Sequence, residues 1–172
     1  MSKIKGKAHK YGANVNTDVL IPARYLHTTD QALWVERALE DLDPTFRARV
    51  RTGDFIVATT NFGCGSSREQ APIVIKATGI SAVIAVSFAR IFFRNAINKG
   101  LSLLESPEAA SDVEMGDELE VDVSTGEIFN LTRDKVYHAT PYPEFMRNLI
   151  TQGGVLPYAR KKLQDAAGPA SR

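Results

Sequence analysis

Apolar residues along the chain gather in short runs of two kinds, which predict strands and helices in alternation. The runs DFIVATT (residues 54–60) and AVIAVS (82–87) are apolar and rich in β-formers, as expected of buried strands. Each precedes a segment with helical spacing that ends at a glycine, EQAPIVIKATG (69–79) and FARIFFRNAINKG (88–100). Two successive strand–helix units predict parallel strands joined by crossover helices.

The flanking segments have other patterns. We expect a short strand at residues 4–9, a long loop at 14–31, and a helix at 31–42 with Leu33, Val35 or Leu39 against the protein body. Alternating apolar positions on both sides of residues 124–126 predict an antiparallel hairpin over 117–132. Two further helices are expected at 143–154 and 155–163. Together these elements predict a mixed α/β domain, parallel in the middle and antiparallel at one side.

Size and charge narrow the classes of protein to consider. The chain has 172 residues, 44% of them hydrophobic, so we expect one domain over residues 1–172 with a frayed tail at 165–172. A formal net charge of +1 without a basic stripe argues against a nucleic-acid partner. No apolar run has the length that a bilayer requires, so we expect a cytoplasmic protein without a membrane partner.

The single cysteine, Cys64, limits the redox chemistry of the chain. It cannot form an intrachain disulfide, which fits a reducing compartment. Iron–sulfur clusters need three or four protein ligands, so this chain cannot hold one alone. Neither His9 nor His138 has metal-ligand spacing around it, and we predict no metal site in this chain. Any cluster has to come from another chain.

The segment NFGCGSSREQ, residues 61–70, is the most informative for function. Its two glycines let the backbone adopt positive φ and approach a ligand closely, and the following helix presents unpaired N–H groups to the turn. Such a turn favours an anion. Ser66 and Ser67 add hydroxyl groups, and Arg68 adds a forked cation that matches a carboxylate. The pattern therefore predicts recognition of a carboxylate substrate.

The same serines have a purely structural interpretation. Ser66 and Glu69 have the spacing of a capping box, in which both satisfy free donors at a helix start, and on spacing alone this is the commoner arrangement. Pro72 argues against it, because a cap at Ser66 places the proline at the sixth helical position, where its ring clashes with the preceding turn. A helix that begins later leaves the serines free. The turn matches neither the lysine-containing phosphate loop nor the GxSxG nucleophile elbow.

Three segments together resemble a known family. NTDVLIPARYL (16–26), NFGCGSSREQA (61–71) and SFARIFFRNAINKGL (87–101) resemble, in this order, the small subunits of 3-isopropylmalate dehydratases, a branch of the aconitase-type hydro-lyases. The resemblance covers almost the whole chain. It implies an α/β fold with three layers, β/β/α, in a swivelling domain with parallel central strands and an antiparallel side hairpin. It also implies a larger partner subunit that carries a [4Fe–4S] cluster.

The resemblance also implies roles for individual residues. Ser66 corresponds to the catalytic base and Asp18 to an active-site aspartate. Ser67 and Gly65 correspond to substrate-binding neighbours, and Arg68 to the residue that holds a substrate carboxylate. The implied reaction removes water from a 2-hydroxy dicarboxylic acid and adds it back in the opposite sense, which interconverts 2- and 3-isopropylmalate in leucine synthesis. A serine hydroxyl is a weak base at neutral pH, so this role requires the positive turn to stabilise the alkoxide.

The loop at residues 23–30 bears on substrate choice, because in the resembled family it contacts the variable part of the substrate. Arg24, His27 and Thr28 are therefore candidate substrate-binding residues. Related subunits that act on homoaconitate-type substrates have an arginine at the position of His27, and those confined to isopropylmalate have an apolar residue. Neutral imidazole suits an isopropyl group and protonated imidazole suits a carboxylate. The substrate stays open among isopropylmalate, homoaconitate and 2,3-dimethylmalate.

Two rival classes of function are a non-catalytic carboxylate-binding domain and a stand-alone serine hydrolase. The dehydratase hypothesis requires that the Ser66 hydroxyl lie at a cleft and that the Arg68 guanidinium not be held in an internal ion pair. Arg90 and Arg94 lie four residues apart on one predicted helix face, and we interpret them as surface or interface charges.

Overall fold

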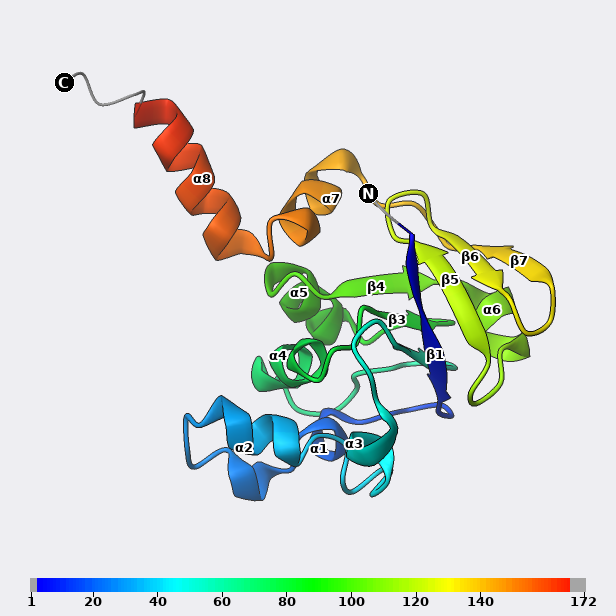
Figure 1. The fold of residues 1–172 in the computed structure, drawn as a ribbon. Coiled ribbons are helices and arrows are strands. Elements are labelled where there is room, and N and C mark those ends of the chain that lie inside the picture. Colours follow the sequence, from blue (N-terminus) through cyan, green and yellow to red (C-terminus); the bar gives the residue numbers. More distant parts are fainter. Residues whose placement is uncertain (1–2, 168–172) are drawn as a thin grey trace.

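The computed structural model describes residues 3–167, which build a seven-stranded sheet with the order β4-β3-β2-β1-β5-β6-β7 (Figure 1). The strands are β1 Ile4–Lys10, β2 Phe55–Ala58, β3 Ala82–Ala85, β4 Ser102–Glu105, β5 Glu118–Asp122, β6 Glu127–Asn130 and β7 Lys135–His138. Strands β1 to β4 are parallel to one another, and β5 to β7 are antiparallel. The predicted parallel centre with an antiparallel hairpin at its side is confirmed.

Strand β1 joins the two halves of the sheet. Its first part, from Ile4 to Lys7, pairs antiparallel with β5. Its last part, from Ala8 to Lys10, pairs parallel with β2. The sheet therefore changes character within a single strand, and both halves depend on the register of β1.

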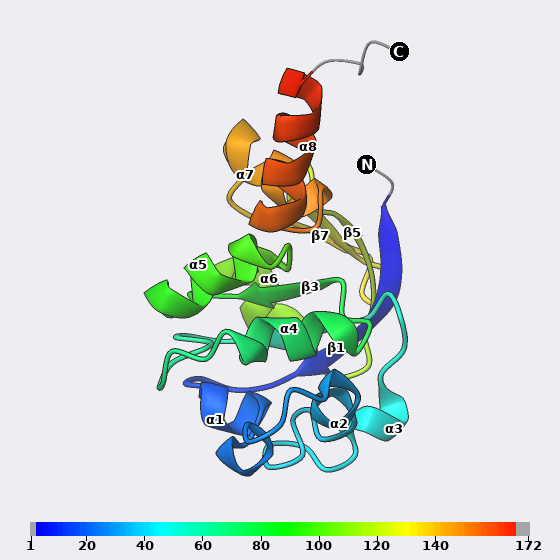
Figure 2. The same ribbon diagram turned by 90° about the vertical axis from the view of Figure 1, so that its left-hand side faces the viewer.

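Residues of the parallel strands alternate between two hydrophobic cores, as expected of a sheet buried on both faces. On β2, Ile56 and Ala58 face one core, and Phe55 and Val57 face the other. The first core contains residues of the helices that cover one face of the sheet, among them α4 and α5 in Figure 2. The second core contains residues of α6 and of the antiparallel strands. The antiparallel half thus curls over the parallel half, which produces three layers, β, β and α.

The helices are short, and most lie on the first face. They are α1 Thr17–Leu20, α2 Gln31–Glu36, α3 Phe46–Arg49, α4 Gln70–Ala77, α5 Arg90–Asn98, α6 Pro107–Asp112, α7 Glu144–Thr151 and α8 Val155–Ala167, with a 3-10 turn at Ala23–Tyr25. The predicted helices around α4, α5, α7 and α8 are confirmed. The segment expected to be a loop, 14–31, contains α1 and the 3-10 turn as well.

The helix expected at 31–42 is wrong in its extent, because α2 ends at Glu36. Trp34 is its buried residue, and the indole N–H donates to the carbonyl of Tyr25 at 2.9 Å. Leu39 is buried as expected, but its φ of 59° is left-handed and ends the helical path. Leu33 and Val35 are only half-buried. Tertiary contacts of Trp34 and Leu39 therefore override the helical pattern of this segment.

Besides α1 and the 3-10 turn, four elements of residues 3–167 were not predicted from the sequence: α3, β4, α6 and β7. Strand β4 begins two residues after Gly100 and completes the parallel half beside β3. Strand β7 is exposed at Lys135, Val136 and His138, so it lacks the alternation that reveals a half-buried strand. Helices α3 and α6 have four and six residues, too few to show a helical period.

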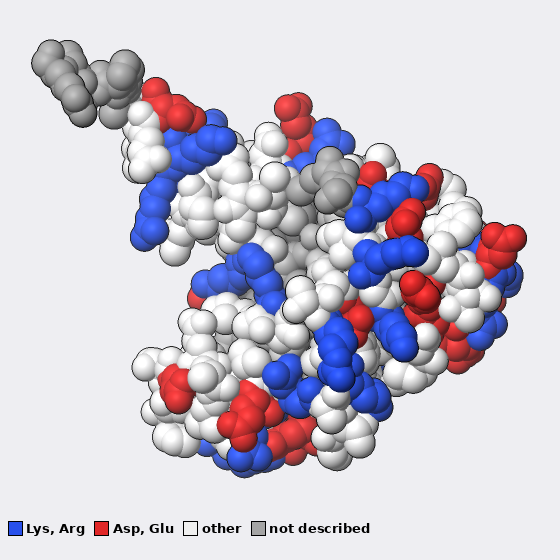
Figure 3. All heavy atoms as spheres, in the orientation of Figure 1, with Lys and Arg blue, Asp and Glu red and all other residues white. Residues whose placement is uncertain are grey.

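Helix α8 projects from the rest of the protein (Figure 1), and it extends through Ala167 into the segment expected to be frayed. The remainder of that expected tail, 168–172, lies outside the described residues. Figure 3 shows a hollow beneath α8, and it shows acidic and basic side chains interspersed over this face of the molecule. No continuous basic stripe crosses the face shown.

A buried hydrogen bond between the side chains of His9 and Asp54 fixes β1 against the start of β2. Nε2 of His9 lies 2.9 Å from Oδ2 of Asp54, and the two side chains are 4% and 5% exposed. Asp54 also accepts hydrogen bonds from the backbone N–H groups of Lys7 and Arg51, each at 2.8 Å. Burial alone raises the pKa of Asp54, but the hydrogen bond from His9 and those from the two N–H groups outweigh it and hold the pKa below its ordinary value.

We expect Asp54→Asn to lower the free energy of unfolding at pH 7 by about 3 kcal/mol, because it removes the charge that three buried donors face. The pKa of Asp54 is lower in the folded state, so its contribution is complete above the unfolded pKa of about 4 and is lost as the pH falls below it. The variant should therefore lose less stability than the wild type between pH 7 and pH 3 in urea titrations. Asp134→Asn, at an exposed turn, is the control. An acid slope in Asp54→Asn equal to that of the wild type contradicts the assignment.

Candidate active site

Three segments that are far apart in sequence meet at the carboxyl ends of β1, β2 and β3, the edge at which sheets of this kind bind ligands. They are residues 14–17, 61–68 and 87–89. The N–H of Gly63 donates to the carbonyl of Val15 at 2.8 Å, and the N–H of Phe62 donates to that of Ser87 at 3.0 Å. Parallel bridges pair Asn16 with Cys64 and Phe62 with Phe88. Backbone hydrogen bonds therefore hold the three segments beyond the ends of the strands.

The turn after β2 requires both of its glycines. Gly63 and Gly65 have φ values of 81° and 88°, which L-residues with a side chain rarely adopt. A Cβ on Gly63 would lie 2.2 Å from the ring of Phe92, and a Cβ on Gly65 would lie 2.3 Å from Oδ1 of Asn16. The turn is thus packed between α5 on one side and the segment that precedes α1 on the other.

The capping-box interpretation of the serines is wrong. Helix α4 begins at Gln70, with Glu69 as a cap residue whose side chain makes no capping hydrogen bond. Pro72 accordingly lies in the first turn, where a proline is tolerated. Both Ser66 and Ser67 are exposed. Their hydroxyl groups are free of the capping role, as the position of Pro72 indicates.

The turn also carries backbone donors that have no acceptor in the described part of the chain. Among residues 3–167, the N–H groups of Gly65, Ser66 and Ser67 make no hydrogen bond. Thr17 binds the other side of the turn: its N–H donates to the carbonyl of Cys64 at 2.9 Å, and its Oγ1 donates to that of Ser66 at 2.7 Å. The carbonyl groups are therefore directed to Thr17, and the N–H groups are left for an anion.

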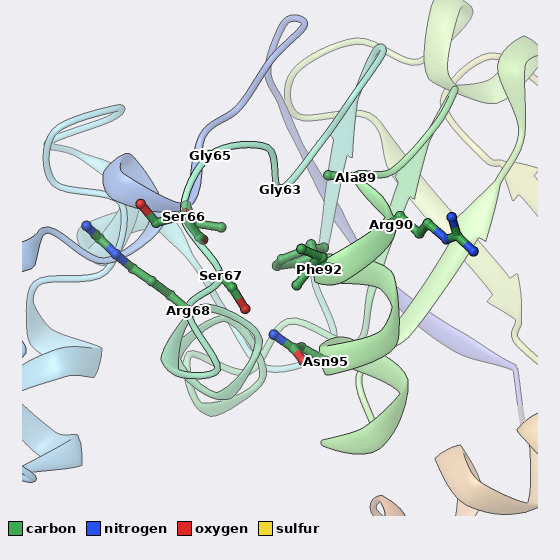
Figure 4. Close-up of a pocket in the computed structure, with 11 residues that line it drawn as sticks. Gly63, Gly65, Ser66, Ser67, Arg68, Ala89, Arg90, Phe92 and Asn95 are labelled. Carbon is green, nitrogen blue, oxygen red and sulfur yellow. The ribbon is translucent and has the colours of Figure 1, made fainter.

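A cavity of about 190 Å³ lies at this turn (Figure 4). Its lining consists of Thr17, Gly63, Gly65, Ser66, Ser67, Arg68, Ala89, Arg90, Ile91, Phe92 and Asn95. One wall is the serine turn and the other is the first part of α5, which begins without a side-chain cap. In Figure 4 the Ser67 hydroxyl points toward the Asn95 amide, and Arg90 extends away from the serines. Small-molecule sites usually enclose about 300–1,000 Å³, so this cavity is small for such a site.

Arg68 is held in an ion pair, but its partner is an exposed carboxylate, so this is not the internal pair that the condition stated from the sequence excludes. Its Nη2 lies 2.6 Å from Oδ1 of Asp18, and its Nη1 donates to the carbonyl of Ile21 at 2.8 Å. The pair lies at the edge of the protein, because the Asp18 side chain is 53% exposed while that of Arg68 is 13% exposed. In Figure 4 the Arg68 side chain extends away from Phe92 and Asn95. The guanidinium has donors beyond the two in use, so the pair orients Arg68 without using its whole capacity.

The predicted residues of the 23–30 loop do not line the cavity. Both Nη atoms of Arg24 bind the carboxylate of Asp41, at 2.8 and 2.7 Å, and Nη2 also binds Glu40. These hydrogen bonds lower the pKa of Asp41 below its ordinary value. Nδ1 of His27 lies 2.7 Å from the carbonyl of Arg24, and the Thr28 hydroxyl accepts a hydrogen bond from the N–H of Asp30. The substrate roles of Arg24, His27 and Thr28 stay predictions.

Sequence reasoning missed five residues of the cavity: Thr17, Ala89, Ile91, Phe92 and Asn95. Thr17 is adjacent to Asp18 in the NTD segment, and its role is clear only when that segment lies against the serine turn. Ile91 and Asn95 are four residues apart and so share one face of α5. Both belong to the segment 87–101, in which the sequence pattern pointed only to Arg90 and Arg94 as charged residues on one helix face.

The structure also bears on metal binding and on membrane insertion. Within the described part of the chain, no group of three or more His, Cys, Asp or Glu side chains is placed to hold a metal ion. None of the helices in residues 3–167 is long and apolar enough to cross a membrane.

Comparison with known proteins places this geometry in a family. The model of the aconitase C-terminal domain matches residues 5–109. The 3-isopropylmalate dehydratase small subunit of Moorella thermoacetica is 55% identical over 161 residues, which are 94% of this chain and 97% of that protein. That of Endomicrobium trichonymphae is 57% identical over 157 residues, 91% of this chain and 96% of the relative. The chain belongs to the family of 3-isopropylmalate dehydratase small subunits.

A solved structure supports the same assignment. The crystal structure of 3-isopropylmalate dehydratase from Methanocaldococcus jannaschii superposes with a TM-score of 0.89 at 43% identity, over 96% of this chain and 99% of that one. The aconitase-type resemblance, the α/β class and the mixed sheet are therefore confirmed. As a dehydratase small subunit, the chain has a large subunit as its implied partner.

We expect Gly65→Ala to lower the free energy of unfolding by about 1–3 kcal/mol, because the new methyl group meets Asn16 and the backbone is held at positive φ. Urea denaturation followed by circular dichroism measures the change. Gly12→Ala is the matched control, since a Cβ there meets nothing within 4 Å. Equal stability of the two variants contradicts the described packing of the turn.

Proposed function

We propose that this chain is the small subunit of a 3-isopropylmalate dehydratase, which interconverts 2- and 3-isopropylmalate by removing and re-adding water in leucine biosynthesis. The observation that carries the proposal is the serine turn, where two exposed hydroxyl groups and unpaired N–H groups line one cavity. Membership in the dehydratase small-subunit family supports the substrate and the reaction. The substrate is a small hydroxy acid with two carboxylates, whose charge suits such a turn.

The reaction makes a physical demand that the turn can meet. Removing a proton from the carbon beside a carboxylate spreads extra negative charge onto that carboxylate. Fixed donors aimed at developing charge commonly supply the largest part of catalysis, and loss of one donor costs about 3–4 kcal/mol. The N–H groups of Gly65, Ser66 and Ser67 have no acceptor among residues 3–167 and are held in place by Thr17. We assign them to the substrate carboxylate, together with the Ser67 hydroxyl.

Ser66 is the proposed base. It is exposed and lines the cavity, and in Figure 4 its hydroxyl points away from Phe92 and Asn95, to the side of the Arg68 guanidinium. The N–H groups of the turn lower the cost of an alkoxide beside them. Ser66 accepts the proton from the substrate carbon and returns it in the reverse direction. Arg68 contributes its remaining donors to a substrate carboxylate, and Asp18 sets the orientation of the guanidinium through the ion pair at 2.6 Å.

We place the [4Fe–4S] cluster in the large subunit. The chain has one cysteine, and its described residues offer no cluster of metal ligands. When bound in the partner, the cluster supplies a Lewis acid for the leaving hydroxyl group. The small volume of the cavity supports a site that the partner completes. The single cysteine also suits a reducing compartment, and we therefore assign the assembled enzyme to the cytoplasm.

The decisive experiment is Ser66→Ala in the chain co-expressed with its large subunit and assayed without oxygen. We expect kcat to fall about 10²–10⁴-fold, the usual contribution of a positioned base, while the two subunits still elute together. Ser111→Ala, at an exposed hydroxyl on α6, is the control. Turnover that survives Ser66→Ala would support the rival of a non-catalytic carboxylate-binding domain. Ester hydrolysis by this chain alone would support the stand-alone serine hydrolase.

The alternative substrates are homoaconitate and 2,3-dimethylmalate. Substitutions at His27 test whether the enzyme prefers one of these acids or 2-isopropylmalate. We expect His27→Arg to raise kcat/KM for the acid with a third carboxylate, because arginine pairs with it. His27→Leu should favour 2-isopropylmalate, whose branch is apolar. Turnover of each acid by the assembled enzyme and by both variants provides the measurement. Unchanged selectivity in both variants would show that the loop does not determine substrate choice. The prediction is demanding, because His27 does not line the cavity in the structure.

A further inference from the structure

The wall of the cavity formed by α5 has no part in the chemistry assigned to the serine turn. Ala89, Ile91 and Phe92 lie at the start of α5 and line the cavity together with the serines. Ile91 is 54% exposed. A single exposed isoleucine is ordinary on a protein surface. Ile91, however, belongs to a group of three apolar residues that all line one cavity, opposite a turn suited to an anion.

We propose that Ile91 is a specificity-determining residue of this site and that its side chain contacts the branched alkyl group of the substrate. The inference rests on the proposed function and adds to it. A substituted malate has charged carboxylates at one part and an apolar branch at another. The carboxylates belong at the N–H groups of the serine turn, and burying an alkyl group against those donors would leave them unsatisfied. The branch therefore belongs on the opposite wall.

Within that wall, Ile91 is the residue free to set the size of the space. Phe92 is 2% exposed, and its ring lies edge-on to Phe62 with the centroids 5.4 Å apart. It also fills the space over Gly63, so its position is fixed by the turn itself. Ala89 is small, and its N–H is committed to the carbonyl of Phe62 at 2.8 Å. A substitution at Ile91 therefore changes how far this wall extends into the cavity, while the hydrophobic core stays the same.

The 23–30 loop does not supply this contact in the structure. Arg24 is bound to Asp41 and Glu40, and the ring of His27 is bound to the Arg24 carbonyl. Neither lines the cavity. The apolar contact nearest to the serine turn therefore comes from α5.

The test uses the assembled two-subunit enzyme and three acids, 2-isopropylmalate and its 2-ethyl and 2-methyl analogues. Each acid is measured as a substrate and as a competitive inhibitor, so that a compound without turnover still reports its binding. For Ile91→Ala we expect kcat/KM for 2-isopropylmalate to fall about tenfold or more, with the 2-methyl analogue changing less than about twofold. Ile91→Phe, which narrows the cavity, should reverse the order of preference. Ile91→Val should lie close to the wild type.

Val136→Ala is the matched control, since Val136 is 46% exposed on β7, away from the cavity. Equal effects of Ile91→Ala on all three acids would overturn the inference while leaving the proposed function intact. Loss of co-elution with the large subunit would overturn it as well, because it would assign Ile91 to the interface. A wild-type complex that turns over none of these acids would overturn the proposed function, and this inference with it.

Discussion

The site depends on the docking of residues 15–17 against the glycine-serine turn. Three hydrogen bonds join them, from the N–H of Gly63 to Val15 and from Thr17 to the carbonyls of Cys64 and Ser66. All three use carbonyl groups as acceptors, and one side of the turn is thereby satisfied within the protein. The N–H groups on the other side are left at the cavity. Under the proposed function, a polar turn that would otherwise be a loop exposed to water is a preorganised anion site.

The parts of this arrangement that depend on a single segment could be predicted from the sequence. The strands β2 and β3, the helices that follow them and the hairpin β5–β6 all have patterns that one segment suffices to define. Pro72 correctly argued that α4 begins after the serines, because the conflict between proline and a capped start is local. The contacts of Thr17, Ile91 and Asn95 with one cavity were not predicted, since they arise when segments distant in sequence meet at the ends of parallel strands.

The ion pair of Arg68 shows where reasoning from residue types fails. An arginine after a glycine-serine turn predicts a free cation, but the same family segment that supplies Asp18 places a carboxylate 2.6 Å from it. Because a charge at the edge of a protein is attracted to the nearest opposite charge, two candidate site residues become partners. Under the proposed function, a substrate carboxylate meets a guanidinium whose orientation is already set by Asp18. Its binding energy comes from donors not yet used rather than from an isolated charge.

Under the proposed function, the two walls of the cavity bind different parts of the substrate. On one side are N–H groups and hydroxyls, and on the other are Ala89, Ile91 and Phe92. A fold with a rigid turn at the strand ends can set the position of a base and of a carboxylate accurately, but it offers no group to take the leaving hydroxyl. Under the proposed function, that group comes from the large subunit. The reacting carbon then lies between the two walls, and the large subunit excludes water when it covers the cavity.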